Sequence, residues 1–246
     1  MKKLLFLILF FSLSINAQDY YLHVGKLFNS NEGKMLDNMT IIVSANKIKD
    51  IKKGYEIPES DNSVIIDLKD STVMPGFIDL HVHIESEYNP EKYLNEFTAE
   101  ESEIAFSSLK YAKRTLMAGF TTVRDLGGSG VNISLRNAIN KGEVIGPRIF
   151  TAGKAIGTTG GHADPTNGWK KSIAGDPGPQ DGVINGVDDA RKAVRERYKN
   201  GADVIKITAT GGVMSIAKNG QNPQFTIEEI KAICETANDY DMIVAA

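Results

Sequence analysis

Two hydrophobic patterns follow one another along the chain. Between residues 18 and 73, short runs rich in β-branched and aromatic residues are separated by turn residues such as Asn46 and Gly54. The runs are "YYLHVGKLFN", "MTIIVSANKIKDIKKG" and "SVIIDLKDSTVMPG". This pattern predicts a small β domain. His23 belongs to it, and because its run contains no acidic residue and no second histidine, we expect its side chain to be structural.

After residue 74, helical and strand patterns alternate. In "EESEIAFSSLKYAKRTLMAG" the apolar residues repeat at helical spacing, and Gly119 is expected to end the helix. Further helices are predicted around 133–140, over 187–201 and after Thr226, which has capping-box spacing with Glu229. Such alternation indicates right-handed βαβ units and a parallel sheet. The strands are predicted to begin near Phe77, Thr121, Arg148, Asp203 and Met242.

These five predicted strands fall short of a closed barrel. A (β/α)₈ barrel has eight strands, and its usual length is about 250 residues. We therefore expect an α/β fold with an incomplete (β/α)₈ barrel, in which residues 74–246 form the first half and end inside the fifth strand. An open parallel sheet of this kind would expose an apolar strand edge. We expect the chain to be part of a longer protein, through a truncated reading frame or as a shortened version of it.

Two histidines end the first of these strands, in "VMPGFIDLHVHIES". Side chains two residues apart point to the same face of a β-strand, so His81 and His83 are expected to face the same way. Two imidazoles on one face can converge on a metal ion. The alternative is a pair of histidines that pack or form hydrogen bonds near a strand end. The preceding Phe77, Ile78 and Leu80 are apolar on both faces, which predicts a strand buried in a parallel sheet.

A lysine occupies another apolar strand, in "DVIKITATGG". Lys206 is flanked by Ile205 and Ile207, and burying an unpaired ammonium group would cost much free energy. The side chain therefore needs a partner or a modified form. Taken alone, the pattern favours a structural lysine that reaches a carboxylate.

The first residues, "MKKLLFLILFFSLSINAQ", combine a basic start, an apolar run and a small residue, Ala17, before a polar sequence. This pattern predicts a secretory signal in residues 1–17, because the apolar run is too short to span a bilayer. We expect an exported protein, periplasmic or secreted, with no stable membrane span after cleavage. The alternative is an apolar N-terminal anchor that stays attached.

Composition narrows the expected partners. The 246 residues include 28 Lys and Arg against 31 Asp and Glu, a formal net charge of -3, and no basic cluster follows the N-terminus. We therefore expect no nucleic acid partner. The single cysteine, Cys234, has no disulfide partner within the chain. Its helical spacing with Ile227, Ile230 and Ala237 predicts a buried structural thiol.

Four segments, taken in order, resemble the amidohydrolase superfamily: "MPGFIDLHVH", "AGFTTVRDLGG", "GPRIFTAGKAIGTTGGHAD" and "ADVIKITATGG". The last three are similar to its imidazolonepropionase-like branch, which includes the Xaa-Pro dipeptidases. The likeness runs from about Met39 to the end of the chain. It implies a small β-sandwich, of which residues 18–73 would be the N-terminal part, beside a barrel that holds one or two divalent metals, usually zinc.

The resemblance also implies roles for three residues. His81 and His83 would bind the first metal, and Lys206, carboxylated on its amine, would bridge two metals, so that a complete site would hold two zinc ions. Carboxylation turns a cationic amine into an anionic oxygen ligand, which would explain a lysine at this strand position. Two metals would activate a bridging water and polarise the scissile carbonyl. Since imidazolonepropionase itself lacks a bridging lysine, the dipeptidase-like group is the closer analogue.

Three other places are candidates for the site. His162 follows "TTGG" after the third barrel strand, and in the resembling group this loop touches the substrate. His162 is therefore a candidate for binding the substrate's carboxylate or carbonyl, with a surface histidine as the alternative. Arg124 and Asp125 end the second strand, where they would face the site or, as we favour, form ion pairs with neighbouring loops. Residues 211–215 are candidates for lining the pocket.

The resemblance implies further groups that this sequence does not contain. The family's next two metal-binding histidines come from strands five and six, and its catalytic aspartate comes from strand eight, beyond Ala246. We therefore assign no catalytic residue. We expect little or no hydrolysis by the isolated chain, because a metal-bound water needs a group that takes its proton and delivers it to the leaving nitrogen.

The leading hypothesis is an exported, metal-dependent hydrolase of a C–N bond, acting on a small molecule such as an Xaa-Pro-type dipeptide or a cyclic amide. Hydantoins, dihydropyrimidines and acylated amino acids stay open as substrates, as do the metal's identity and the oligomeric state. The second hypothesis is a non-catalytic exported binding protein, or a relic, that retains part of the metal pocket.

Overall fold

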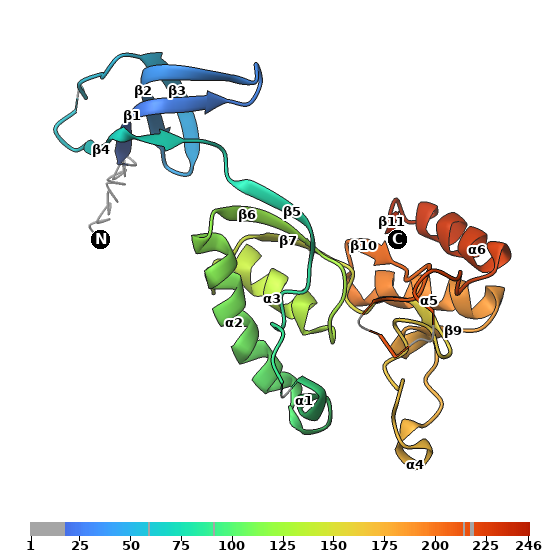
Figure 1. The fold of residues 1–246 in the computed structure, drawn as a ribbon. Helices are drawn as coiled ribbons and strands as arrows, with labels where there is room; N and C mark the ends of the chain where they lie inside the picture. Colours follow the sequence, from blue (N-terminus) through green and yellow to red (C-terminus); the bar gives the residue numbers. More distant parts are fainter. Residues whose placement is uncertain (1–17, 59, 91, 214, 217–218) are drawn as a thin grey trace, which may run out of the picture. The chain divides into compact units, whose positions relative to one another are not determined.

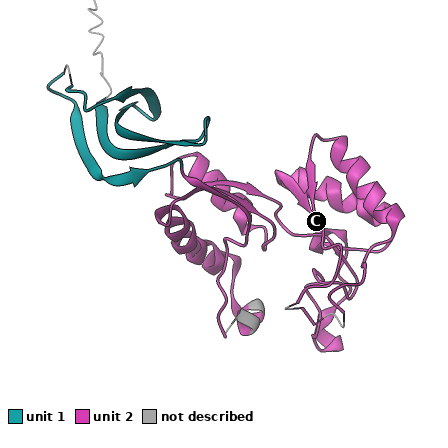
Figure 2. Cartoon of the chain, turned by 45° about the horizontal axis from the view of Figure 1, so that its top comes forward, with its two compact units in different colours: residues 1–75 teal, residues 76–246 magenta. Residues whose placement is uncertain are grey.

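The computed structural model describes residues 18–246 except 59, 91, 214, 217 and 218. The chain divides into two compact units, residues 1–75 and residues 76–246 (Figure 2). The predicted signal, residues 1–17, lies outside the described residues. None of the helices in the described part is long and apolar enough to cross a membrane.

The first unit is a four-stranded sheet (Figure 1). Its strands are β1 (Asp19–Asn29), β2 (Lys34–Ser44), β3 (Lys47–Lys53) and β4 (Val64–Val73). They lie in the order β3-β2-β1-β4, with β1 antiparallel to β2, β2 antiparallel to β3, and β4 parallel to β1. The runs of apolar residues therefore form strands as predicted.

The core of this sheet contains Val24, Leu27, Met39 and Ile41. His23 is buried, and its Nε2 atom lies 2.8 Å from the carbonyl oxygen of Glu56, so its role is structural, as predicted. The described strands of the first unit, β1 to β4, form a single sheet. A second, facing sheet, which a sandwich requires, stays a prediction.

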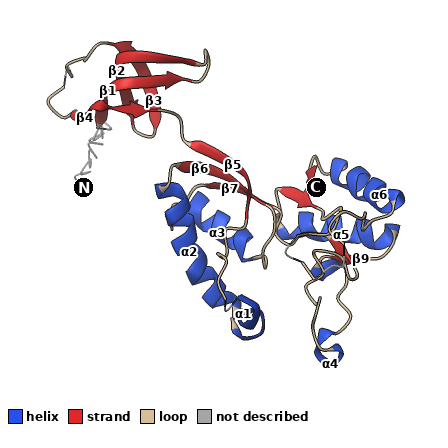
Figure 3. Ribbon diagram, viewed as in Figure 1, coloured by secondary structure: helices blue, strands red, loops and turns tan. Residues whose placement is uncertain are grey.

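The second unit alternates strands and helices (Figure 3). Its elements, in chain order, are β5 (Phe77–Val82), α1 (Lys92–Thr98), α2 (Glu101–Met117), β6 (Phe120–Asp125), α3 (Val131–Asn140), β7 (Arg148–Thr151), β8 (Gly157–Thr158), α4 (Lys171–Ala174), the 3₁₀ turn η1 (Pro179–Asp181), β9 (Val183–Ile184), α5 (Val187–Asn200), β10 (Val204–Lys206), α6 (Ile227–Asn238) and β11 (Ile243–Ala245).

Every strand pair of this unit is parallel. β5, β6 and β7 form one sheet in that order, β10 pairs with β11, and β8 pairs with β9. Strands β5, β6, β7, β10 and β11 lie where the sequence predicts the five barrel strands. The described strands do not close into a barrel. The α/β fold is therefore confirmed, and the incomplete barrel stays a prediction.

Local signals set the ends of the helices. At the start of α6, the Thr226 hydroxyl accepts the N–H of Glu229 at 3.2 Å, and the Glu229 carboxylate accepts the N–H of Thr226 at 2.8 Å. This is the predicted capping box. Helix α5 ends at Gly201, whose φ of 87° suits a glycine, and Gly119 follows α2 with a φ of 96°.

Two predictions of burial are wrong. Phe77, Ile78 and Leu80 are 50%, 63% and 58% exposed, because β5 is an edge strand and the core of its sheet lies over β6 and β7. Cys234 is exposed on α6, since the buried face of that helix contains Ala232, Ile233, Thr236 and Ala237 instead. The spacing of apolar residues predicts which face of a helix or strand is apolar, but not how much of that face the rest of the fold covers.

Candidate functional site

The predicted metal ligands lie at the carboxyl ends of two parallel strands. His81 is in β5 and His83 follows its last residue, while Lys206 is the last residue of β10. The two imidazole rings have centroids 5.5 Å apart, so they face the same way, as predicted. The carboxyl ends of parallel strands are the usual place for a ligand site in α/β folds.

His83 has a fixed orientation. Its Nδ1 atom lies 2.9 Å from the carbonyl oxygen of Gly127, in the loop after β6. Because a carbonyl oxygen only accepts, Nδ1 carries the proton in this contact and Nε2 keeps a free lone pair. A second hydrogen bond of this kind is what metal-binding histidines usually have. The backbone of His81 is held as well, by an N–H that donates to Asp79 at 2.9 Å.

Lys206 is 9% exposed, and its side chain has neither a hydrogen-bond nor an ion-pair partner among the described residues. Burial, and then the positive charge of Arg124, lower the pKa of its amine. The structural lysine that reaches a carboxylate, which the strand pattern alone favoured, is therefore wrong for the described part of the chain. A buried amine whose pKa is lowered spends more time uncharged, which is the state that can be modified.

His162 lies in the loop that follows β8, and it is exposed. Its backbone N–H donates to the side chain of Gln224 at 2.8 Å, and a Cβ atom at Gly212 would stand 2.2 Å from the His162 ring. The ring therefore packs directly on Gly212, one of the residues predicted to line the pocket. This contact ties the loop of His162 to the loop that follows Lys206.

Electrostatics place these residues near one another. Burial and then the charge of Lys206 lower the pKa of His81, and His83 and Arg124 contribute to the same shift. Burial, Lys206 and His83, in that order, lower the pKa of His162. The structure thus brings His81, His83, His162 and Lys206 into one electrostatic environment.

The donor set fits a divalent metal in part. The lowered pKa of His81 favours its neutral imidazole, which is the form that can bind a metal. The hydrogen bond from His83 Nδ1 to the Gly127 carbonyl leaves Nε2 of His83 available. No group of three or more His, Cys, Asp and Glu residues in the described part of the chain is arranged to hold a metal ion. Two imidazoles are too few for a tight site, so a third ligand from the described residues would have to be a modified Lys206.

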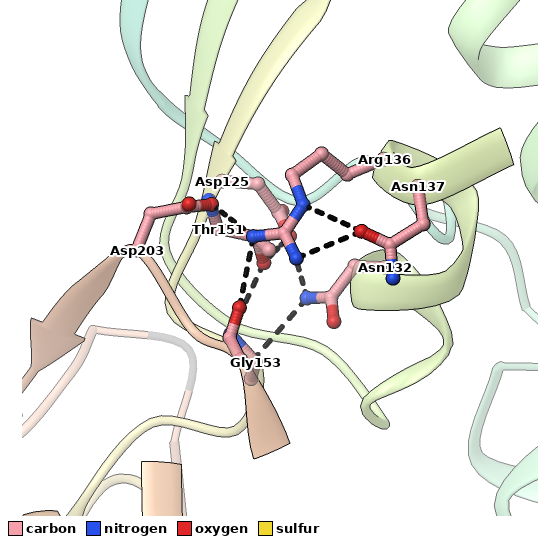
Figure 4. Close-up of polar contacts among 8 residues, drawn as sticks. Asp125, Asn132, Arg136, Asn137, Thr151, Gly153 and Asp203 are labelled. Carbon is pink, nitrogen blue, oxygen red and sulfur yellow. Dashed lines mark hydrogen bonds and ion pairs between the residues drawn. The ribbon is translucent and has the colours of Figure 1, made fainter. Parts of the chain in front are cut away.

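Sequence reasoning did not predict a buried polar cluster around Asp125, which contacts the backbone of the residue after His83. Asp125 is fully buried and accepts a hydrogen bond from the Ile84 N–H at 3.1 Å. It also accepts from the Asn132 amide at 2.6 Å and the Thr151 hydroxyl at 3.0 Å (Figure 4). Burial raises its pKa to about 6. The predicted ion pair is wrong at Asp125, and Arg124 instead donates to the carbonyl of Leu80 at 2.8 Å.

Glu85 completes this cluster. Its carboxylate is buried and accepts the backbone N–H groups of Ser129 at 2.6 Å and Asn132 at 2.7 Å, at the start of α3. A Cβ atom at Gly128 would stand 2.6 Å from this carboxylate, so glycine permits the approach. Carboxylates are favoured at helix N-termini, and here one fixes the chain that leaves His83. No local signal reveals it, because Glu85 and Ser129 are far apart in sequence.

The loops after the strands contact one another. The rings of Phe97 and Trp169 lie with centroids 4.6 Å apart, which joins α1 to the segment after His162. A Cβ atom at Gly168 would stand 2.5 Å from Ile216, which joins that segment to the loop after β10. Three loops, each following a strand end at the site, therefore form a continuous and largely apolar set of contacts.

A separate hollow of about 360 Å³ does not belong to this site. It lies at the amino ends of β7 and β10, where Arg136 forms an ion pair with Asp203 (Figure 4). Arg136 also donates to the Gly201 carbonyl. None of the four predicted site residues lines it. The hollow is therefore at the opposite ends of the strands from the chemistry.

Comparisons with known proteins agree on one family. The family model described as the amidohydrolase family matches residues 72–246. Ochratoxinase from Aspergillus niger is 32% identical over 231 residues, which are 87% of this chain and 47% of that protein. The chain therefore spans about half the length of the curated relatives it matches.

Solved structures give the same result. A Xaa-Pro dipeptidase with bound methionine in the active site has a TM-score of 0.86 and 48% identity, over 92% of this chain and 56% of that one. A prolidase complexed with N-methylphosphonate-L-proline has a TM-score of 0.76 and 34% identity, over 92% of this chain and 55% of that one. The crystal structure of the A. niger ochratoxinase has a TM-score of 0.76 and 29% identity, over 93% of this chain and 55% of that one.

Proposed function

Because the chain belongs to the amidohydrolase family, we propose that it is part of a metal-dependent hydrolase that cleaves a C–N bond in a small amide or dipeptide. The observation that carries this proposal is the buried amine of Lys206, unpaired among the described residues, whose charge acts on His81 at the carboxyl ends of parallel strands. A merely structural strand end would not need an unpaired buried lysine there.

We assign His81, His83 and a carboxylated Lys206 as the ligands of a divalent metal, with zinc as the expected ion and two ions in a complete site. Bound at these ligands, the metal supplies a Lewis acid and an activated water. His83 is held by the Gly127 carbonyl with Nε2 free, and Glu85 anchors the chain that follows it. Both contacts preorganise the imidazole, which limits the entropy lost when a ligand binds.

His162 is assigned to the substrate. Its backbone N–H donates to Gln224, its ring packs on Gly212, and the charge of Lys206 helps to lower its pKa. With a lowered pKa, His162 is neutral at pH 7, so it would donate or accept a hydrogen bond at the substrate's carbonyl or carboxylate rather than pair with it as a cation. The proton-transfer group stays unassigned among the described residues.

The substrate class is inferred from relatives. Structures named as a Xaa-Pro dipeptidase and a prolidase, together with an ochratoxinase, are all among the similar proteins. We propose an Xaa-Pro-type dipeptide first and a cyclic amide second. The largely apolar contacts of Phe97, Trp169 and Ile216, in the segments that follow β5, β8 and β10, agree with a substrate that carries an apolar group.

We further propose the architecture that this activity requires. Strands β5, β6, β7, β10 and β11 would be five strands of a (β/α)₈ barrel, and the first unit would be the N-terminal part of a β-sandwich. The exposed apolar residues of β5 support this, because further strands would cover them. The predicted signal would direct export, which mass spectrometry of the mature N-terminus would test, with Gln18 expected as the first residue.

The test combines metal analysis with hydrolysis. The 246-residue chain and a version extended through the downstream reading frame are assayed for zinc content and for cleavage of Xaa-Pro dipeptides. We expect about two zinc ions and hydrolysis in the extended protein. His81→Gln should reduce both, whereas His23→Gln, the matched histidine in the first unit, should leave both unchanged. An extended protein with neither metal nor hydrolysis would favour the second hypothesis, a binding protein or relic.

A further inference from the structure

Helix α5 buries an arginine that the proposed chemistry does not use. Arg197 is 3% exposed, and no carboxylate forms an ion pair with it within the described residues. Burial lowers the pKa of its guanidinium, while Glu196 and Asp181 act in the opposite direction. A buried cation without a carboxylate is rare enough to need an explanation.

Its partners are backbone carbonyls from two separate segments. The Nε atom donates to the carbonyl of Lys154 at 2.8 Å, and Nη1 donates to the carbonyls of Pro179 and Gln180 at 3.3 and 3.4 Å. The planar guanidinium can serve both segments at once, which a single ammonium group cannot do with the same geometry. Arg197 therefore joins the chain after β7 to the turn η1.

The first of these segments lies directly on the strand of Lys206. Two residues after Lys154, the N–H of Ile156 donates to the carbonyl of Lys206 at 2.8 Å, and the carbonyl of Ile156 accepts the N–H of Thr208 at 3.0 Å. The next residue, Gly157, begins β8 and donates to the carbonyl of Gly182 at 2.8 Å. The segment is thus held between β10 on one side and the exit of η1 on the other.

The same segment leads to His162. Strand β8 ends at Thr158, and the turn that follows closes with the N–H of Gly161 donating to the Thr158 carbonyl at 2.8 Å. His162 is the next residue. Arg197 therefore holds the chain two residues before the backbone pairing of Ile156 with Lys206, in the segment that leads to this turn.

We propose that Arg197 is a positioning residue, which fixes the backbone that carries His162 against the strand that carries Lys206. It touches neither the substrate nor the proposed metal, and it acts only through the backbone. The proposal rests on the proposed function for the role of His162. The geometry it sets can nevertheless be measured without hydrolysis or metal.

One close contact supports this role. Gly182, with a φ of 94°, approaches the same segment so closely that a Cβ atom would stand 2.2 Å from the carbonyl oxygen of Ala155 and 3.1 Å from Nη2 of Arg197. Nη2 itself is buried without a hydrogen-bond partner in the described part of the chain. The guanidinium thus keeps a buried donor unsatisfied while it holds the two segments together.

The first test follows the imidazole of His162 by NMR as the pH is varied, in the metal-free chain. The variant Arg197→Lys keeps the positive charge but loses the planar guanidinium that donates to both segments. The segment that leads to His162 should then shift, and the imidazole should feel the charges of Lys206 and His83 less. We expect the midpoint of its titration to rise toward the ordinary value of a histidine, because His162 then leaves the burial and the positive charges that lower its pKa. Arg195→Lys, at an exposed position of the same helix, should leave the midpoint unchanged.

A second variant disturbs the same contact without removing the guanidinium. Gly182→Ala places a Cβ atom 2.2 Å from the Ala155 carbonyl oxygen and 3.1 Å from Nη2 of Arg197, so it forces the two segments apart and should change the His162 titration in the same direction. In an active extended protein, both variants should raise KM about 10-fold with a smaller change in kcat. A folded Arg197→Lys or Gly182→Ala protein with the wild-type His162 titration overturns the proposal, even if the protein hydrolyses dipeptides. A changed titration in a protein that hydrolyses nothing leaves the positioning intact and removes only the proposed function.

Discussion

Two buried cationic side chains among the described residues of the second unit differ in what surrounds them. Arg197 in α5 donates to three backbone carbonyls. Lys206 in β10 has no partner for its side chain among the described residues. Burial lowers the pKa of both groups.

This difference separates a structural cation from a reactive one. A guanidinium stays charged even when its pKa is lowered, so it must be satisfied by acceptors, and the carbonyls beside Arg197 provide them. An amine can escape the cost of burial by losing its proton, and the free amine can then add carbon dioxide to give a carbamate and a proton. The carbamate would be an anionic ligand next to His81 and His83, which is the form we propose for Lys206.

The largest expected effect is on catalysis at Lys206. In the extended protein, Lys206→Arg keeps a cation but cannot form the carbamate, and Lys206→Met removes the nitrogen. We expect both variants to lower kcat/KM at least about 1,000-fold, because a metal contributes several kcal/mol to the transition state. Zinc content should fall in parallel. If Lys206→Arg keeps both activity and zinc, the lysine is not a metal ligand.

The next effect is on stability, and it has opposite signs at the two cations. Arg197→Met leaves three carbonyls near α5 without their donor, and we expect the free energy of unfolding to fall by about 3 kcal/mol. Lys206→Met removes a buried amine that has no partner among the described residues, so we expect no loss of stability and even a small gain. Urea unfolding of both variants measures this contrast. Equal destabilisation would mean that Lys206 also has a structural partner.

A smaller effect is expected from Asp125, a buried carboxylate of the same unit. Its pKa is about 6 in the folded protein against 3.8 for the ordinary group, so between these pH values the folded state binds more protons than the unfolded one. Stability should therefore fall as the pH rises from 4 to 6, by about 2 to 3 kcal/mol. Asp125→Asn should remove this slope, whereas Asp188→Asn, at an exposed position, should keep it. A wild-type slope in Asp125→Asn assigns the pH dependence to another group.

The smallest effect concerns the link between the two loops. Gly212→Ala places a methyl group where the ring of His162 lies, 2.2 Å from its Cε1 atom, so the ring must move. We expect KM to rise about 10-fold, which is about 1.4 kcal/mol. Gly220→Ala in the same loop meets nothing closer than 3.9 Å and serves as the control. Steady-state kinetics on the extended protein would measure both, and an unchanged KM in Gly212→Ala would remove His162 from the substrate site.

Sequence reasoning recovered the elements and the site's outline for definite reasons. His81 and His83 share a face because the strand period is two, whatever lies around them. It failed at Asp125, where it favoured an ion pair, because the partners come from α3 and β7 and only the fold brings them together. It failed at Lys206 for the same reason, since whether a carboxylate reaches a buried amine depends on neighbours that are distant in sequence.

By itself the sequence determined the strand positions, the helix ends at Gly119 and Gly201, the capping box of α6 and the shared face of the two histidines. These features depend on periodicity, glycine conformation and contacts within a few residues. Only the tertiary structure decided that no carboxylate of the described residues pairs with Lys206, that Arg197 joins two segments, and that β5 is exposed at an edge. Burial and hydrogen-bond satisfaction are properties of the space between elements, and that space exists only once the chain has folded.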